Sequence, residues 1–345
     1  MGYPDDIQRV SSLPLPWEKM KGCNILIVGA TGLIGSSLVK VLLARGDADY
    51  QVYACGRDYA RALVLFKSFE TDERFHFISM DVIVPIKCDI DFHFIIDAAS
   101  NASPNFFAAN PVEIIKSNIY GVANLLDYGK EHNLKRFLFV SSGEMYGQGD
   151  NKAFTEDFSG FVDYSSPRSC YPSSKRAAEV LCQAYAQEYR LDVTIARPCH
   201  IYGPHFSDRD NRVFAQFFRN LLNNEDIVLK SDGLQFRSWC YVVDCCSALL
   251  YILLKGFSGE AYNIADENSN LTIREFASRI AAIKGRDVTF HAPSQNEIVG
   301  FNPVSQSLFD TTKIRGLGWS VDGDIDTKLK HTYLEMVSSA DIASS

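Results

Sequence analysis

Residues 24–35 run Asn24-Ile-Leu-Ile-Val-Gly29-Ala-Thr-Gly32-Leu-Ile-Gly35, and this stretch decides the fold. The apolar segment at 24–28 is typical of a buried parallel strand, and a helical pattern at 33–44 follows it directly. Glycines between a strand and a helix permit a tight turn and let backbone N–H groups approach a pyrophosphate. The stretch therefore predicts a dinucleotide-binding loop whose helix N-terminus favours negative charge. The alternative is an ordinary strand-to-helix turn.

The alternation of strand and helix patterns continues from this loop to about residue 197. We expect strands at 51–55, 75–79, 92–98, 136–141 and 192–197, and helices at 60–69, 111–132 and 173–189. Such alternation predicts a parallel sheet covered by helices on both faces. The expected fold class is α/β, a Rossmann-type doubly wound parallel sheet.

The second half of the chain has a looser pattern, with turn residues gathered at 202–204 and 208–211. Helices are expected at 213–223, 244–254 and 273–283, and strands at 227–230 and 261–264. These elements predict a smaller mixed α/β substrate-binding domain at 198–345, after a dinucleotide-binding domain at 22–197. Later segments, at about 235–265, are expected to return to the larger domain.

The composition limits the classes of function. The 345 residues are 46% hydrophobic and 22% charged, which favours a packed core over disorder. A net charge of −8 argues against a general nucleic-acid binder, although a local cationic pocket for a phosphorylated small molecule is compatible with it. No apolar run approaches the ~20 residues of a membrane span. Residues 1–21 lack the apolar core of a signal peptide. We therefore expect a cytoplasmic protein without membrane contact.

The nine cysteines form no CxxC pair. This pattern predicts buried thiols in a reducing compartment and no metal site.

The end of the second strand bears on cofactor choice. An acid at this point would hold the ribose hydroxyls of NAD, but the sequence is Cys55-Gly56-Arg57-Asp58. A guanidinium suits a 2′-phosphate, so Arg57 favours NADP(H) over NAD. The alternative is that Asp58 caps the next helix and Arg57 lies in solvent. Asp81, after the third strand, is expected to contact the adenine.

Two motifs at the ends of later strands predict acid–base chemistry. Ser142 and Glu144 follow the fifth strand, and Tyr171-Pro-Ser-Ser-Lys175 comes later. The four-residue spacing puts Tyr171 and Lys175 on one helical face, and Pro172 is tolerated only in a first turn. A nearby ammonium is expected to lower the phenol pKa from about 10, so that Tyr171 acts as a base while Ser142 hydrogen-bonds the same substrate oxygen.

Taken together, these motifs resemble those of the extended short-chain dehydrogenases/reductases, in the NAD-dependent epimerase/dehydratase family that acts on nucleotide sugars. The resemblance covers about residues 24–333. It also includes Asn118-Ile-Tyr-Gly121, Ser141-Ser-Gly-Glu-Met-Tyr-Gly147, Arg197-Pro, Tyr202-Gly-Pro204, Tyr262-Asn-Ile264 and Leu317-Gly-Trp319. Two stretches, Ala99-Ser-Asn-Ala-Ser-Pro104 and Pro167-Arg-Ser-Cys-Tyr171, are similar to UDP-glucuronate decarboxylases.

The resemblance implies that Ser142, Tyr171 and Lys175 are catalytic, with Glu144 beside them, and that Asn118 supports the site. The cofactor is expected to contact Gly29, Thr31, Gly32, Leu33, Ile34, Gly35, Arg57, Asp81, Val82, Ala98, Ala99, Ser100, Asn118, Tyr171, Lys175 and Pro198. The substrate is expected to contact Ser103, Ser142, Gly143, Glu144, His200, Arg212 and Arg237, with Arg237 and Arg212 at the nucleotide diphosphate. Relatives pair the helices at 111–132 and 173–189, which implies a homodimer.

Two departures from the family pattern, at Gly143 and His200, bear on the reaction. Sugar 4,6-dehydratases place an acid where Gly143 stands, and an elimination needs its proton; decarboxylases commonly have a serine there. Glu144 agrees with the family pattern. Its expected role is either to drive chemistry at C5 or C6, or to fix the loop through backbone N–H groups. His200 replaces an asparagine near the diphosphate, and the alternative role is a hydrogen-bonded loop histidine.

The sequence therefore predicts a nucleotide-sugar oxidoreductase that works through a 4-keto intermediate, in the form of a 4-epimerase. The alternatives are a UDP-glucuronate decarboxylase, a 4,6-dehydratase or an NADPH-dependent keto-sugar reductase. A cofactor-sensing regulator on the same fold is the non-enzyme alternative, but such proteins typically lose the tyrosine and the lysine.

Overall fold

A parallel seven-stranded sheet forms the centre of the computed structural model, which describes residues 1–100, 102–208, 210–291 and 304–344. The strands, in spatial order, are β10 (Ala261–Ile264), β6 (Val193–Pro198), β5 (Arg136–Val140), β4 (Phe94–Asp97), β1 (Cys23–Val28), β2 (Tyr50–Gly56) and β3 (Phe75–Ser79). All neighbouring pairs run parallel. The order reverses between β1 and β4, and ligands bind outside the carboxyl ends of strands at such a point.

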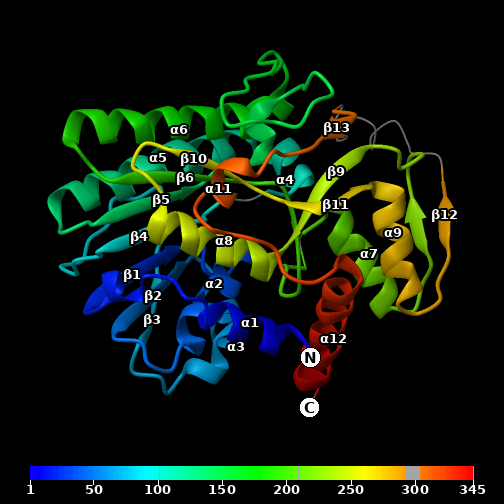
Figure 1. Cartoon of the computed structure of the whole chain (residues 1–345), viewed down its shortest axis with the longest axis horizontal. Helices are drawn as coiled ribbons and strands as arrows, with labels where there is room; N and C mark the ends of the chain where they lie inside the picture. Colours follow the sequence, from blue (N-terminus) through cyan, green and yellow to red (C-terminus); the bar gives the residue numbers. More distant parts are fainter. Residues whose placement is uncertain (101, 209, 292–303, 345) are drawn as a thin grey trace.

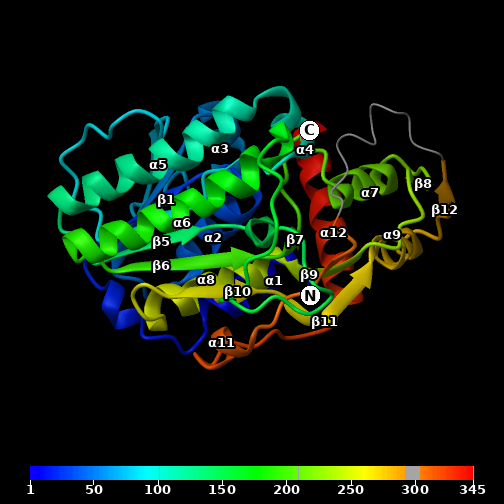
Figure 2. The same cartoon turned by 90° about the horizontal axis from the view of Figure 1, so that it is seen from above.

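Helices cover both faces of this sheet, which confirms the predicted doubly wound architecture (Figures 1 and 2). One face packs against α5 (Pro111–Glu131) and α6 (Cys170–Tyr189), and the other against α2 (Leu33–Ala44) and α8 (Val242–Lys255). Along β4, Ile95 packs into the core under α5 and α6, and Ile96 packs into the core under α2 and α8. This alternation follows from the two-residue period of a strand. Shorter helices are α3 (Tyr59–Leu65) and α4 (Pro104–Ala109), with 3₁₀ turns at Trp17–Met20, Lys67–Phe69, Gly143–Tyr146 and Pro167–Ser169.

The smaller half of the molecule is built around a second sheet. Its strand β9 (Phe236–Tyr241) pairs with β7 (His200–Tyr202), β11 (Asp266–Thr272) and β13 (Gln306–Ser307), and β8 (Ile227–Leu229) pairs with β12 (Val288–Phe290). The helices here are α7 (Val213–Leu222), α9 (Ile273–Ala282), α11 (Thr312–Arg315) and α12 (Ile325–Ser344). Within 235–265, α8 and β10 pack with the large sheet, whereas β9 belongs to the second sheet. The domain boundary itself stays a prediction, and residues 209, 292–303 and 345 of the second domain lie outside the described residues.

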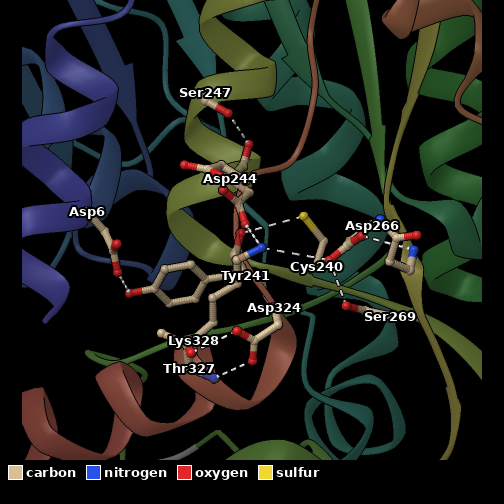
Figure 3. A network of polar contacts seen from close by, with 12 residues as sticks. Asp6, Cys240, Tyr241, Asp244, Ser247, Asp266, Ser269, Asp324, Thr327 and Lys328 are labelled. Carbon is tan, nitrogen blue, oxygen red and sulfur yellow. Dashed lines mark hydrogen bonds and ion pairs between the residues drawn. The ribbon is translucent and has the colours of Figure 1, made fainter. Parts of the chain in front are cut away.

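An N-terminal helix that the sequence analysis did not anticipate, α1 (Tyr3–Ser11), ties the two ends of the chain together. It buries Tyr3, Ile7 and Val10 against the body of the protein. The Asp6 carboxylate accepts a hydrogen bond from the Tyr241 hydroxyl at 3.1 Å (Figure 3). In the same network Asp244, in the first turn of α8, forms an ion pair with Lys328 of α12 at 2.8 Å.

Two further observations concern the class of protein. In the described ranges, no helix has both the length and the apolar character required to cross a bilayer. All nine cysteines are free thiols, and most of them are buried.

Candidate active site

A large cleft of about 1630 Å³ opens at the carboxyl ends of the parallel strands. Every residue predicted to bind the cofactor or substrate, or to act in catalysis, lines this cleft, with the exception of Asn118. The fold therefore brings together motifs that are widely separated in the sequence. Asn101, in one of the motifs shared with decarboxylases, lies outside the described residues.

The glycine loop has the geometry that a dinucleotide requires. Gly29 has φ +75°, and a Cβ there would lie 2.6 Å from the Ala98 carbonyl oxygen. A Cβ at Gly35 would lie 2.3 Å from the Gly29 carbonyl oxygen, so the loop and α2 can approach only without side chains. Gly32, the N-cap of α2, provides no side-chain cap. The first-turn N–H groups therefore remain for a pyrophosphate, and these residues fit an NAD(P)-type cofactor.

At the predicted adenosine end of the cleft, each interpretation of the Arg57-Asp58 pair is met in part. Asp58 caps α3, accepting from the Arg61 N–H at 2.9 Å. Arg57 lines the cleft with 61% of its side chain exposed, and it pairs with Glu113 at 3.0 Å and Asp81 at 3.8 Å. A 2′-phosphate would therefore have to compete with two carboxylates for the guanidinium.

The tyrosine and lysine of the predicted catalytic motif share one face of α6. The helix begins at Cys170, so Pro172 falls in its first turn as predicted. The Lys175 Nζ lies 5.9 Å from the centroid of the Tyr171 ring and donates to the Val140 carbonyl at 2.9 Å. Burial lowers the pKa of Lys175 to about 8, so its ammonium form still dominates at neutral pH.

The expected lowering of the Tyr171 pKa is wrong for this structure. Burial raises the pKa of Tyr171 to about 12, because desolvation of the phenolate outweighs the hydrogen bond with Ser142 and the charges of Arg212 and Arg168. Tyr171 therefore holds its proton here, and further positive charge is needed before it can act as a base.

Asn118 supports the site from behind the cleft rather than lining it. Its Oδ1 accepts from the Ser100 hydroxyl at 2.9 Å, and its Nδ2 donates to the Ser174 hydroxyl at 2.8 Å. Ser174 in turn donates to the Tyr171 carbonyl at 3.1 Å. The chain of hydrogen bonds links the loop after β4 to the start of α6.

Glu144 has a partner that sequence reasoning missed. The Arg168 Nη2 lies 2.8 Å and 3.1 Å from the two oxygens of the Glu144 carboxylate. The guanidinium also lies over the Phe107 ring, at 5.1 Å, and that ring stacks on Tyr171 with centroids 4.5 Å apart. Arg168 belongs to the Pro167-Arg motif shared with decarboxylases, and this motif is the sequence feature that could have indicated a role for it. The ion pair engages both oxygens of the Glu144 carboxylate.

Gly143 is closed to any side chain by Phe309. A Cβ at position 143 would lie 2.0 Å from the Phe309 Cζ. Phe309 is 2% exposed and packs edge-on against Tyr146 and Phe154. The place where dehydratases carry an acid is therefore filled by an aromatic ring.

The predicted diphosphate end is lined by two arginines and a neutral histidine. Burial, with the charges of Arg237 and Arg212, lowers the pKa of His200 to about 3. Arg237 is 3% exposed and donates to the Phe236 carbonyl at 3.0 Å. Arg212 pairs with Asp210 in the same wall. Separately, the Ser103 hydroxyl donates to the Asn211 side chain.

Comparison with known proteins adds to this geometry. The model of the NAD dependent epimerase/dehydratase family matches residues 25–265. UDP-glucuronic acid decarboxylase 6 of Arabidopsis thaliana is 32% identical over 280 residues, which cover 80% of each chain. A dTDP-glucose 4,6-dehydratase of Streptomyces venezuelae, solved with NAD and TYD bound, is 25% identical with a TM-score of 0.78, over 92% of this chain and 98% of that one. A UDP-glucuronic acid 4-epimerase of Bacillus cereus shares the fold, with 24% identity and a TM-score of 0.79 over 91% and 99% of the chains.

Proposed function

The chain belongs to the NAD dependent epimerase/dehydratase family, and from this premise we propose that it is a nucleotide-sugar 4-epimerase that works through a 4-keto intermediate. The family consists of enzymes, so the cofactor-sensing regulator is set aside. One observation carries the proposal: Tyr171 and Lys175 adjoin Ser142 in the cleft, while Gly143 is closed by Phe309. The site thus offers acid–base chemistry at C4 without a free acid for elimination.

In the proposed mechanism Tyr171 takes the proton of the C4 hydroxyl as a phenolate, which the positive charges of Lys175 and of a bound oxidised nicotinamide would stabilise. Ser142 hydrogen-bonds the same oxygen, and the transfer returns Tyr171 to the neutral phenol. Phe107, stacked on Tyr171, keeps water from that ring. A nicotinamide cofactor held by the glycine loop would supply the hydride acceptor and donor for C4.

The substrate is proposed to be a nucleoside diphosphate sugar. Arg237 and Arg212 line the same cleft as the catalytic residues, and guanidinium groups suit phosphate oxygens. His200 between them is neutral and offers ring nitrogens for hydrogen bonding without a charge of its own.

Decarboxylation of a nucleoside diphosphate uronic acid is the second candidate, and Arg168 favours it. Its guanidinium lines the cleft and suits a C6 carboxylate, which would share it with Glu144. A 4-keto uronic acid is a β-keto acid, so the loss of carbon dioxide does not need an acid at position 143. The Arabidopsis relative is named as a decarboxylase of this kind. Dehydration is disfavoured because Phe309 fills the position of the acid.

We also propose a preference for NADP(H) over NAD(H) and the formation of a homodimer. Gly56 and Arg57 support tighter binding of NADP(H) than NAD(H), although the family is NAD-dependent. A homodimer through α5 and α6 is proposed from the family resemblance. An NADPH-dependent reductase would rest on the same Arg57.

The deciding experiment is incubation with UDP-, dTDP-, GDP- and CDP-sugars, followed by mass spectrometry and NMR. An unchanged mass with inverted C4 configuration supports the epimerase. Loss of carbon dioxide identifies a decarboxylase, loss of water a dehydratase, and gain of two hydrogens a reductase. Failure of every sugar in cofactor-loaded protein would overturn the proposal.

A further inference from the structure

Asp97, the last residue of β4, is a buried carboxylate that the proposed mechanism does not use. Its side chain is 4% exposed, and its Oδ1 accepts a hydrogen bond from the Ala99 N–H at 3.0 Å. A buried ionised carboxylate is unfavourable unless a cation or several donors offset its lost hydration. A specific partner should therefore account for its presence beside the cleft.

The sheet register places Asp97 next to the catalytic lysine. Asp97 lies opposite Phe139 in the parallel pairing of β4 and β5. The Lys175 Nζ lies 4.6 Å from the Phe139 ring centroid and donates to the carbonyl of the next residue, Val140. Asp97 is two residues from Ile95, so it faces the same α5–α6 layer, and α6 carries Lys175. Carboxylate and ammonium therefore lie in the same layer at the ends of two adjacent strands, where each acts electrostatically on the other without a direct ion pair.

The other ionisable groups around Lys175 are already neutral or engaged. Glu179, one helical turn after Lys175, is held by Arg197, whose Nη2 lies 2.6 Å from its carboxylate. Cys182, which acts on Lys175, and Cys55, which acts on Asp97, are buried thiols with raised pKa values, so they stay uncharged. The Tyr171 phenol is protonated as well. Among the described groups that act on Lys175, Asp97 is thus the carboxylate without a competing cation.

We propose that Asp97 is a positioning residue that keeps Lys175 protonated and directed at Tyr171 while the C4 hydroxyl is oxidised. This inference rests on the proposed function, in which the lysine ammonium supports the tyrosine base. Asp97 acts through Lys175 and does not touch the substrate.

The pair defines a pH window in which both charges exist. Burial raises the pKa of Asp97 to about 6, and burial lowers the pKa of Lys175 to about 8 while Asp97 opposes that fall. Below about pH 6 the carboxylate gains a proton, and above about pH 8 the ammonium loses one. Removing the Asp97 charge removes the opposing influence, so the lysine should lose its proton at lower pH.

The direct test is the titration of Lys175 in protein labelled with ¹³C at lysine Cε, with the resonance assigned by Lys175→Arg. Asp97→Asn keeps an oxygen for the Ala99 N–H and removes only the charge. We expect the midpoint of Lys175 to move down by about one pH unit or more, the scale for loss of a nearby opposite charge. Asp266→Asn is the matched control. That residue is 3% exposed, lies in the second sheet and bonds Ser269 (Figure 3), and its loss should leave the midpoint unchanged.

Two further measurements keep the proposal open to refutation. In the wild-type protein the Lys175 resonance should show a second inflection near pH 6, from Asp97, so the test survives even if Asp97→Asn does not fold. With an active nucleotide sugar, the alkaline limb of kcat should move to lower pH in Asp97→Asn while KM changes little. An unchanged Lys175 midpoint or a missing inflection overturns the proposal. If no sugar is turned over, the proposed function fails while the titration still decides the role of Asp97.

Discussion

Replacement of Gly143 by alanine tests whether the ring of Phe309 closes the position of the missing acid. The added Cβ would stand 2.0 Å from Phe309 Cζ and 2.5 Å from Cε1, far inside van der Waals contact. The ring has little freedom to move, because Tyr146 and Phe154 pack against it and the Phe309 N–H donates to Ser238 at 3.2 Å. The variant should therefore be overpacked.

The magnitude follows from the packing. Extra methyl groups in a closed core typically cost about 1–3 kcal/mol. For a chain of this size, each kcal/mol lowers Tm by about 2 °C, so we expect a fall of roughly 2–6 °C for Gly143→Ala. Gly46→Ala is the matched control: nothing lies within 4 Å of a Cβ built there, and its effect should stay within about 0.5 kcal/mol.

The assay is urea unfolding followed by tryptophan fluorescence, for Gly143→Ala, Phe309→Leu and the double variant. Leucine lacks the ring atoms that meet the new Cβ, so the double variant should recover about 1–3 kcal/mol relative to the sum of the single changes. Strict additivity, or a Gly143→Ala protein as stable as the wild type, would refute the steric reasoning. Dehydration by Gly143→Asp alone would refute it as well, because the ring should deny the acid its place.

The remaining predictions concern chemistry, cofactor and assembly. Tyr171→Phe should bind cofactor normally, yet lose turnover by at least ~100-fold; near-normal turnover would remove the base assignment. Activity should decline as pH rises through about 8, because Lys175 loses its charge there; a rate profile that stays flat far above this pH would contradict that role. Calorimetry should show tighter NADP(H) than NAD(H) binding, with the preference lost in Arg57→Ala; a well-placed guanidinium contact is worth about 1.5–3 kcal/mol, or roughly tenfold to a hundredfold. Equal or tighter binding of NAD by the wild type would refute the predicted preference for NADP(H). Light scattering should give a dimer mass, since Ile115 on α5 and Val180 on α6 are exposed; a monomer at micromolar concentration would exclude it.

The order of elements in the large sheet could be predicted because each strand and helix has a recognisable local hydrophobic pattern. The predicted strand at 75–79 and helix at 33–44 coincide with β3 and α2. The helix expected at 60–69 is divided into α3 and a 3₁₀ turn, since Asp58 caps its start while Phe66 turns into the core. Helix α1 was missed because its apolar face holds only Tyr3, Ile7 and Val10 among polar residues, and its partners lie far along the chain.

The predicted site residues came from short motifs whose spacing fixes their geometry, as with Tyr171 and Lys175 on one turn of α6. What sequence could not supply was the environment of each group. The pKa of Tyr171 is set by burial, which no local pattern reveals. Asp97 looks like any strand-end residue until the register of β4 and β5 brings it beside the lysine.

The same distinction bears on which reaction this site performs. The proposed oxidation at C4 uses groups that a single strand end and a single helix provide, so short motifs suffice to predict it. In the proposed reaction the fate of the 4-keto sugar would depend on the groups near C5 and C6. Beside Ser142 the structure packs Phe309 against Gly143 and pairs Arg168 with Glu144. Phe309 arrives on the segment beside β13, far along the chain from the loop that it closes. A glycine at position 143 by itself says only that an acid is missing. Because the Phe309 ring occupies the space beside position 143, we expect that substitution there alone does not restore an acid to the site. The search for activity should therefore begin with reactions that need no proton from a side chain at position 143.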